Sequence, residues 1–212
     1  MSDVPRETEL SARYSQIPGI QAFADLLATS GVERGLIGPR EVPRLWSRHL
    51  VNCAVVAQEA TDVIPLGSTV ADVGSGAGLP GLVWALVRPD LKVTLIEPLL
   101  RRATFLSEAV AELSVEDRVE VLRARAEDVA PRRFHVVTAR AVARLPQLLT
   151  WTLPLASVGG VVAALKGSSA AQEVAEAEAT RAALGAGPIT IRSYGIGIIE
   201  PPTTVVVVPR AR

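Results

Sequence analysis

The sequence reads Ala71-Asp72-Val73-Gly74-Ser75-Gly76-Ala77-Gly78-Leu79-Pro80-Gly81 at the point where the fold of this 212-residue chain is decided. A largely apolar run, residues 63–70, precedes this stretch, and a helix-like run, residues 82–87, follows it. The order strand, glycine loop, helix is how an open α/β sheet holds a nucleotide-like ligand. Glycine lets the backbone adopt positive φ and lets a ligand approach the main chain. The unpaired N–H groups of the next helix would then face the same crevice.

The glycine pattern alone leaves the ligand open. Residues 76–81 satisfy the dinucleotide pattern G-x-G-x-x-G, which is a weak match by itself. Asp72 stands where a dinucleotide site keeps an apolar residue, and Pro80 removes one N–H donor from the turn. An acid at this strand end favours a cationic, amino-acid-like ligand over a pyrophosphate. Asp72-x-Gly74-x-Gly76 also resembles the first motif of S-adenosylmethionine-dependent methyltransferases, which we favour over NAD binding and over a turn that binds nothing.

Composition excludes several other classes. The single cysteine, Cys53, rules out an internal disulfide framework and a cysteine-based zinc site. The two histidines, His49 and His135, lack metal-ligand spacing, so we expect no metal. No run is long and uncharged enough to span a membrane, and the N-terminus lacks the pattern of a signal peptide. We therefore expect a cytoplasmic protein that does not associate with membranes.

Hydrophobic periodicity predicts the order of the elements. Residues 16–30 and 41–60 carry apolar side chains at helical spacing, and strands and helices alternate from about residue 68. We expect strands at 69–73, 92–97, 119–122, 134–138, 160–165, 189–191 and 204–208. We expect helices at 82–87, 101–113 and 170–184, and another that begins at 145. This alternation predicts a Rossmann-like α/β fold with a mainly parallel seven-stranded sheet covered on both faces. The expected organisation is an N-terminal helical cap, residues 1–65, and a core, residues 66–212, in one compact unit.

The ends of the first four strands should line one crevice. Glu97 ends the second strand, near the ~20 residues past the loop at which an acid meets ribose hydroxyls; a solvated strand-end acid is the alternative. After the third strand, Glu127 can accept from an adenine amino group and the Ala126 backbone can meet the ring edge, whereas helix capping by Asp128 is the structural alternative. Arg140 ends the fourth strand. It can pair with a ligand carboxylate or a substrate phosphate, or form an ordinary surface ion pair.

Charge is unevenly distributed along a chain whose formal net charge is zero. No acid occurs between Asp128 and Glu173. The cations within that stretch are Arg132, Arg133, Arg140, Arg144 and Lys166. In a neutral protein this separation predicts a one-sided positive surface suited to a polyanion. The alternative is that the arginines scatter over a solvated face.

Several motifs then occur in the order of a known family. They are Arg48-His49-Leu50, the loop at 72–81, Glu97-Pro98-Leu99-x-Arg101-Arg102-x-x-Phe105-Leu106, Arg125-Ala126-Glu127, Thr138-Ala139-Arg140-Ala141-Val142-Ala143 and Leu165-Lys166-Gly167. From about Trp46 to the C-terminal strand, the chain resembles the bacterial 16S rRNA guanine-N7 methyltransferases, also called glucose-inhibited division protein B. One departure is visible. The family commonly continues Arg-His-Leu with x-Asp-Ser, whereas this chain has Val51-Asn52-Cys53 and so loses a carboxylate and a hydroxyl.

The resemblance implies methyl transfer from S-adenosylmethionine to N7 of a guanine in the decoding-region loop of 16S rRNA, either free or in the small ribosomal subunit. Guanine N7 carries a lone pair and no proton, so its attack needs no general base. Catalysis would rest on in-line positioning and on electrostatics tuned to the moving positive charge. We expect the acting form to be a monomer. A methyltransferase of a small molecule or protein, and a NAD-linked oxidoreductase, remain the alternative functions.

The same resemblance, with the crevice argument, gives each residue an expected role. Arg140 is the expected catalytic residue, between cofactor and target. The expected cofactor-binding residues are Gly74, Gly76 and Leu79 at the methionine end, Glu97 at the ribose, Ala126 and Glu127 at the adenine, and again Arg140. The candidates for RNA phosphate contacts, which position the substrate without specifying its sequence, are Arg48, Arg101, Arg102, Arg144 and Lys166.

Overall fold

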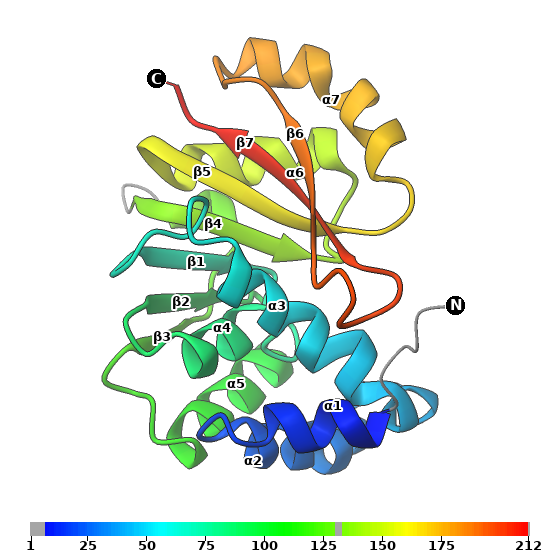
Figure 1. Ribbon diagram of the computed structural model, residues 1–212. Coiled ribbons are helices and arrows are strands. Elements are labelled where there is room, and N and C mark those ends of the chain that lie inside the picture. The colour runs from blue at the N-terminus through cyan, green and yellow to red at the C-terminus, as the bar shows by residue number, and fades with distance from the viewer. Residues whose placement is uncertain (1–6, 130–132, 212) are drawn as a thin grey trace.

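The sheet consists of seven strands in the described part of the chain. They are β1 (Thr69–Val73), β2 (Lys92–Ile96), β3 (Val119–Leu122), β4 (Phe134–Arg140), β5 (Ala156–Lys166), β6 (Thr190–Tyr194) and β7 (Thr203–Pro209). The structure is a computed structural model that describes residues 7–129 and 133–211. The strand order is β3-β2-β1-β4-β5-β7-β6, with only β7 antiparallel to its neighbours (Figure 1). The predicted Rossmann-like, mainly parallel seven-stranded sheet is therefore confirmed.

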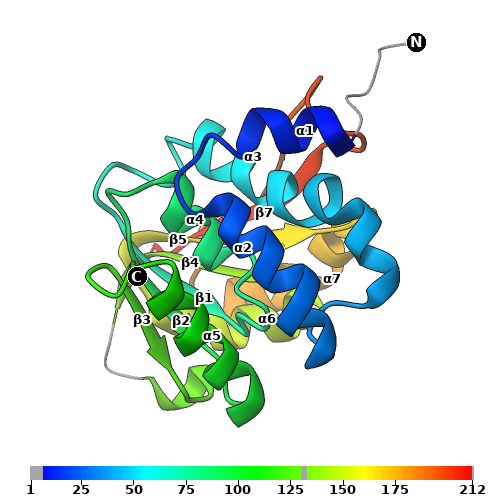
Figure 2. The ribbon, with the colours of Figure 1, turned by 90° about the horizontal axis from the view of Figure 1, so that it is seen from below.

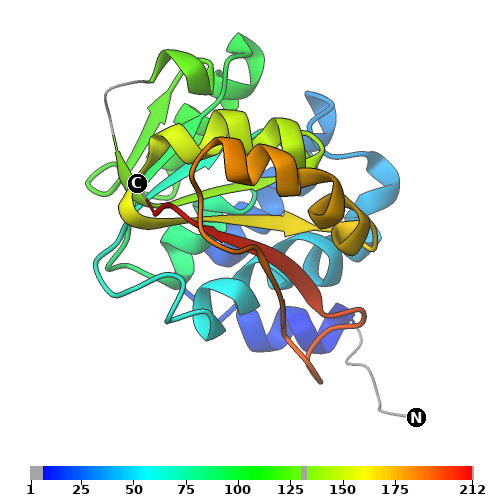
Figure 3. The same ribbon diagram turned by 90° about the horizontal axis from the view of Figure 1, so that it is seen from above.

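Helices cover both faces of this sheet, as predicted. One face carries α3 (Val51–Glu59), α4 (Gly81–Val87) and α5 (Leu100–Glu112), seen from below in Figure 2. The other face carries α6 (Leu145–Thr152), the short turn η5 (Leu153–Leu155) and α7 (Ala170–Ala183), seen from above in Figure 3. Among the described residues, no helix combines the length and apolar character that a membrane crossing requires.

Burial on both faces explains the apolar runs of the strands. In β1, Val70 belongs to the core under α3, α4 and α5, whereas the next residue, Ala71, belongs to the core under α6 and α7. Successive strand residues point to opposite faces, so a strand covered on both sides must be apolar at nearly every position. The position of the central strands was therefore readable from the sequence.

The N-terminal cap differs from its prediction. It consists of α1 (Glu7–Tyr14), α2 (Ile20–Leu26), η1 (Leu27–Gly31), η2 (Pro39–Arg44) and η3 (Trp46–Leu50), which leads into α3. Helix α1 was not predicted, and the expected helix at 16–30 begins only at Ile20 because Gly19 before it has φ of +80°. The expected helix at 41–60 is a 3-10 segment, a π-helical segment and then α3.

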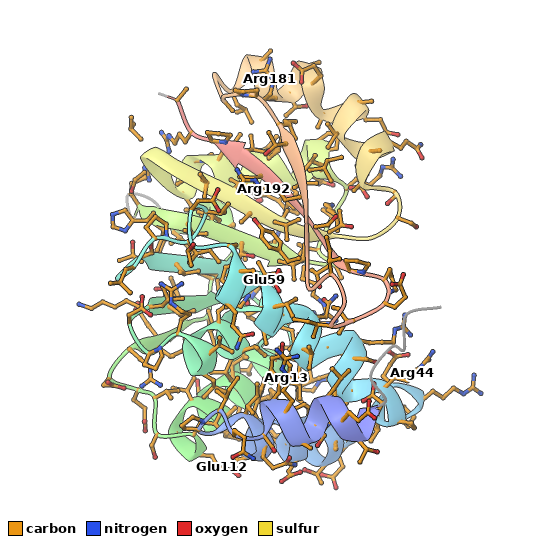
Figure 4. The ribbon with its side chains drawn as sticks, in the orientation of Figure 1. Arg13, Arg44, Glu59, Glu112, Arg181 and Arg192 are labelled. Atoms are coloured by element: carbon orange, nitrogen blue, oxygen red, sulfur yellow. The ribbon has the colours of Figure 1, made fainter. Side chains whose placement is uncertain are left out.

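Cap and core side chains pack in one cluster. Phe23 of α2 shares that cluster with Leu82 of α4, and its ring lies so close to the glycine loop that a Cβ on Gly78 would be 3.2 Å from Phe23 Cζ. Glu59, labelled in Figure 4, accepts the Gly195 N–H at 2.9 Å and so links α3 to the loop after β6. The packing favours one compact unit. The boundary at residue 65 stays a prediction, and residues 1–6 of the expected cap lie outside the described residues.

The start of α4 has no room for a side chain. A Cβ on Gly81 would be 2.6 Å from Leu95 Cδ2 and 2.7 Å from Asp72 Cβ. We predict that Gly81→Ala lowers the free energy of unfolding by about 1–2 kcal/mol, because the overpacking outweighs the helix propensity gained from alanine. In the control Gly38→Ala, φ is −68° and the nearest contact would be 3.9 Å, so stability should stay near the parent's. Urea unfolding measures both, and equal midpoints for Gly81→Ala and the parent would contradict the steric account.

Candidate functional site

Two buried carboxylates hold the glycine loop. The Gly81 N–H donates to Asp72 Oδ2 at 3.0 Å, and the Gly76 N–H donates to Glu97 Oε2 at 3.0 Å. Glu97 Oε1 accepts the Leu99 N–H at 3.0 Å, so the same side chain orients the turn after β2. Glu97 is only 1% exposed. It therefore lies beside the loop, as its spacing predicted, but it also supports the loop from beneath.

Asp72 does not face the crevice, although its position in the sequence suggested a contact with a cationic ligand. It is fully buried under the loop, and its Oδ1 has no hydrogen-bond partner among the described residues. Burial raises the pKa of the Asp72 carboxyl to about 7, against the opposing effects of the Gly81 N–H, Ser75 and the Arg140 charge. Asp72 is thus a structural acid that titrates near neutrality.

Two adjoining cavities lie over the carboxyl ends of β1, β2 and β4. Their volumes are about 390 Å³ and about 190 Å³, and they share Gly74, Arg102 and Ala141. The predicted cofactor residues on the smaller cavity are Gly74, Gly76, Leu79 and Arg140, and those on the larger are Gly74, Ala126 and Glu127. The structure therefore brings these residues together around two adjoining cavities, whereas Glu97 lies just behind the loop and lines neither cavity. Asp128 lies at the end of the short η4 segment (Ala126–Asp128) and is not the N-cap of any helix in the described residues.

Apolar side chains that the sequence argument missed line the larger cavity. Leu99, Val142 and Trp151 are among them. They come from three separate segments, so no local motif indicates that they meet. Leu99 and Val142 did lie within the quoted motifs, which was the available signal. Together they make this cavity suitable for a flat, weakly polar ring such as a purine.

A third cavity is also lined by Arg140. Its volume is about 590 Å³, and Arg140, Ala141 and Val142 line it as well as the cavities beside the glycine loop. Ala141 has φ of +56°, an uncommon conformation for a residue with a Cβ, and it turns the chain at the end of β4. Residues 140–142 thus border both spaces and form a wall that the spaces share, and the role of Arg140 between cofactor and target stays a prediction.

The cap holds the Arg140 guanidinium. Arg140 Nη1 lies 3.4 Å from the Arg48 carbonyl oxygen, 3.3 Å from Asn52 Oδ1 and 3.4 Å from Cys53 Sγ, and Nη2 contacts His49 Nδ1. Asn52 and Cys53 are the positions at which the sequence departs from the family pattern. The amide of Asn52 keeps an acceptor for Arg140 there without a negative charge.

Two cations of the predicted positive surface, Lys166 and Arg144, form ion pairs with acids of α7. Lys166 Nζ lies 2.7 Å from Glu173 Oε2 with both side chains 9% exposed, and it also donates to the Ala143 carbonyl at 2.7 Å. Arg144 pairs with Glu176 at 2.5 Å. Lys166 is thus a partly buried cation with an ion-pair partner, and the charge of Arg144 is offset by Glu176. Their roles as phosphate contacts stay predictions.

The other candidate cations differ in their surroundings. Arg48 lies 3.2 Å from Glu41, and Arg102 lies 3.9 Å from Glu97 at the rim of the cofactor-side cavities. Arg101 is exposed and has no ion-pair partner within the described residues. Arg132 lies outside the described residues. Arg101 is therefore the strongest of the predicted phosphate contacts.

Comparisons with known proteins agree with this geometry. A family model described as rRNA small subunit methyltransferase G matches residues 16–197. A protein of that name from Salinispora tropica is 58% identical over 198 residues, covering 90% of this chain and 80% of its own. Its counterpart from Streptomyces coelicolor is 55% identical over 186 residues, covering 87% of this chain and 76% of its own.

Solved structures show the same fold at much lower identity. The O-methyltransferase TomG from Streptomyces achromogenes, in complex with S-adenosylmethionine, has a TM-score of 0.60 at 16% identity and covers 90% of each chain. A ribosomal protein L11 methylase from Lactobacillus delbrueckii has a TM-score of 0.57 at 18% identity, covering 77% of this chain and 79% of its own. These likenesses establish a methyltransferase fold.

The buried acid under the loop generates a pH prediction. The pKa of Asp72 is raised from 3.8 to about 7 in the folded chain, so between these pH values the folded state keeps a proton that the unfolded state has released. The free energy of unfolding should therefore fall as pH rises through this window. Asp72→Asn keeps an acceptor for the Gly81 N–H and cannot ionise, so its stability should fall less over the same range. Urea unfolding at several pH values tests this, and parallel pH profiles for the two proteins would contradict it.

Proposed function

We propose a function on the premise that the chain belongs to the rRNA small subunit methyltransferase G family. It transfers a methyl group from S-adenosylmethionine to N7 of a guanine in the decoding-region loop of 16S rRNA. The observation that supports this most directly is the wall at residues 140–142, which lines both the cofactor-side cavities and the cavity of about 590 Å³ beyond them. A reaction between two bound molecules needs two such spaces with a shared boundary.

The cofactor is assigned to the two cavities beside the glycine loop. Its methionine end would lie against Gly74, Gly76 and Leu79, where the loop offers backbone polar groups. Each oxygen of Glu97 already accepts one backbone N–H and keeps a further lone pair, so a ribose hydroxyl that reaches this 1% exposed side chain would find an acceptor. The adenine would lie in the apolar cavity with the Ala126 backbone and Glu127 at its edge. The bound cofactor supplies a methyl group on a positively charged sulfur.

Arg140 is proposed as the residue between cofactor and target. Its contacts with the cap use Nη1 and one hydrogen of Nη2, so within the described residues the Nε–H and the second hydrogen of Nη2 remain for ligands. A guanidinium at this boundary can donate to the cofactor carboxylate on one side and to a phosphate of the target nucleotide on the other. Because guanine N7 is unprotonated, these contacts serve alignment and no side chain has to remove a proton.

The substrate is proposed as 16S rRNA, free or within the small ribosomal subunit, and the acting form as a cytoplasmic monomer. Transfer of labelled methyl from S-adenosylmethionine to 16S rRNA tests the reaction. The sharper test replaces the target guanine with 7-deazaguanine, which keeps the Watson–Crick edge and lacks the N7 atom. Transfer to the natural RNA and none to the 7-deaza RNA is the expected result. Equal transfer to both would contradict N7 as the acceptor.

Arg140→Ala should weaken cofactor binding and, even when S-adenosylmethionine saturates the variant, nearly abolish methyl transfer. Removal of the guanidinium leaves the target unaligned, which we expect to lower the single-turnover rate by a factor of about 100 or more. Calorimetry with S-adenosylmethionine and a thermal melt are the controls for a folded, cofactor-binding variant. A parent rate for the variant at saturating RNA would remove Arg140 from the reacting centre.

Phosphate contacts should appear in the salt dependence of RNA binding. Arg101→Ala removes an exposed cation without an ion-pair partner among the described residues, so the slope of log K against log salt should become shallower by about one unit. Arg144→Ala is the matched control, because Glu176 already offsets its charge and the slope should change less. The measurement is the RNA affinity of the parent and of both variants at several salt concentrations. If the parent slope is near zero, the substrate is a small molecule or protein; if Arg144→Ala has the larger effect, Glu176 does not neutralise its arginine on the RNA.

A further inference from the structure

His49 joins an acid of the cap to the arginine of the site. It lies on η3 with its side chain only 14% exposed. Its Nδ1 contacts Arg140 Nη2, and its Nε2 lies 3.1 Å from Glu41 Oε2 on η2. Glu41, His49 and Arg140 therefore form a continuous chain from the cap to the end of β4, and His49 also lines the smaller cofactor-side cavity.

The chemistry of the two neighbours allows His49 one protonation state. A guanidinium has only donors, so Nδ1 must present a lone pair to Arg140. An ionised carboxylate has only acceptors, so Nε2 must carry the hydrogen that Glu41 accepts. A second proton on the ring would set an N–H and a positive charge against the guanidinium. The neutral Nε2–H form is thus the one that satisfies both contacts.

We propose that His49 is a positioning residue for the methyl transfer: in its neutral Nε2–H form it holds the Arg140 guanidinium at the boundary between the cavities, and Glu41 fixes that form. This proposal rests on the proposed function, since it assigns His49 a task in that reaction. It also explains why the cap is needed beside the core. The acceptor for Arg140 comes from η3, and the acid that orients that acceptor comes from η2.

The charged groups around the imidazole give the proposal a pH dependence. Burial lowers the pKa of His49, and the Arg140 and Arg48 charges lower it further, whereas the hydrogen bond and charge of Glu41 raise it. Arg44 forms an ion pair with Glu41 and so acts on the His49 ring indirectly. Cys53 of α3 and Asp72 of β1 interact with the charge of Arg140. The working form of His49 therefore prevails at neutral pH and is lost as pH falls through its lowered pKa.

The first measurement is made on the free full-length protein, independently of activity. The chain has two histidines, so imidazole nitrogen NMR across a pH series resolves both, and His135→Asn assigns them. We expect His49 as the Nε2–H tautomer, with its pKa below the ordinary value and lower still in Glu41→Gln. Equal populations of the two tautomers, or an unchanged pKa in Glu41→Gln, would overturn the proposal even if the protein methylated rRNA.

The second measurement is the pH profile of single-turnover methyl transfer. His49→Leu removes the acceptor and should lower the rate at least tenfold when S-adenosylmethionine saturates the variant. His49→Asn places an amide oxygen near the Nδ1 position, so it should recover part of the rate and lose the acidic limb. Glu41→Gln should move that limb to lower pH. His135, whose Nδ1 accepts the Thr69 N–H at 3.1 Å at the opposite end of β4, gives the matched control His135→Asn, with the parent profile.

The outcomes distinguish failure of the His49 proposal from failure of the proposed methyl-transfer function. A parent rate in His49→Leu, or an acidic limb that persists unshifted in His49→Asn, would overturn the positioning role. A parent protein that binds S-adenosylmethionine and transfers nothing to rRNA would contradict the proposed function instead. In that case the NMR series still decides whether His49 holds Arg140 in the stated form.

Discussion

The contact between the Arg140 guanidinium and the N-terminal cap is the interaction on which the site depends. A guanidinium at a partly buried strand end needs acceptors, because an unpaired buried charge is costly. Within the described residues, its hydrogen-bond partners all come from η3 and α3: the Arg48 carbonyl, His49, Asn52 and Cys53. The core alone therefore leaves this cation without its ligands. The cap is part of the site, and it also packs against the glycine loop through Phe23.

The glycine loop likewise depends on hydrogen bonds to buried groups, here two carboxylates that lie under it. Asp72, near the end of β1, accepts the Gly81 N–H, and Glu97, just after the adjacent parallel strand β2, accepts the Gly76 N–H. Burial of an acid is unfavourable, and the raised pKa of Asp72 is the sign of that cost. These hydrogen bonds restrict the conformation of the loop before a ligand binds. A preorganised site loses less free energy to ordering when it binds.

Much of the fold could be predicted because the central strands are buried on both faces and hence apolar throughout. Glu97 could be placed from its spacing after the loop, and Arg140 from its position at the end of the fourth strand. The structure of the cap could not be predicted in the same way, because 3-10 and π-helical segments such as η2 and η3 do not follow the periodicity of an α-helix. Charge was the least predictable property. The acid-free stretch includes Lys166, yet its partner Glu173 follows just beyond that stretch, on α7.

The role of His49 is a second example of a contact that local sequence does not predict. The motif Arg48-His49-Leu50 was visible in the sequence, but nothing local indicates that its imidazole meets Arg140, which lies far along the chain. The central claim is that this chain methylates one guanine of 16S rRNA at N7. Mass mapping of 16S rRNA from cells with and without the protein tests it most directly. The account predicts that one guanine in the decoding-region loop loses a single methyl group, at N7, when the protein is absent. Identical methylation of that loop in both samples would contradict it.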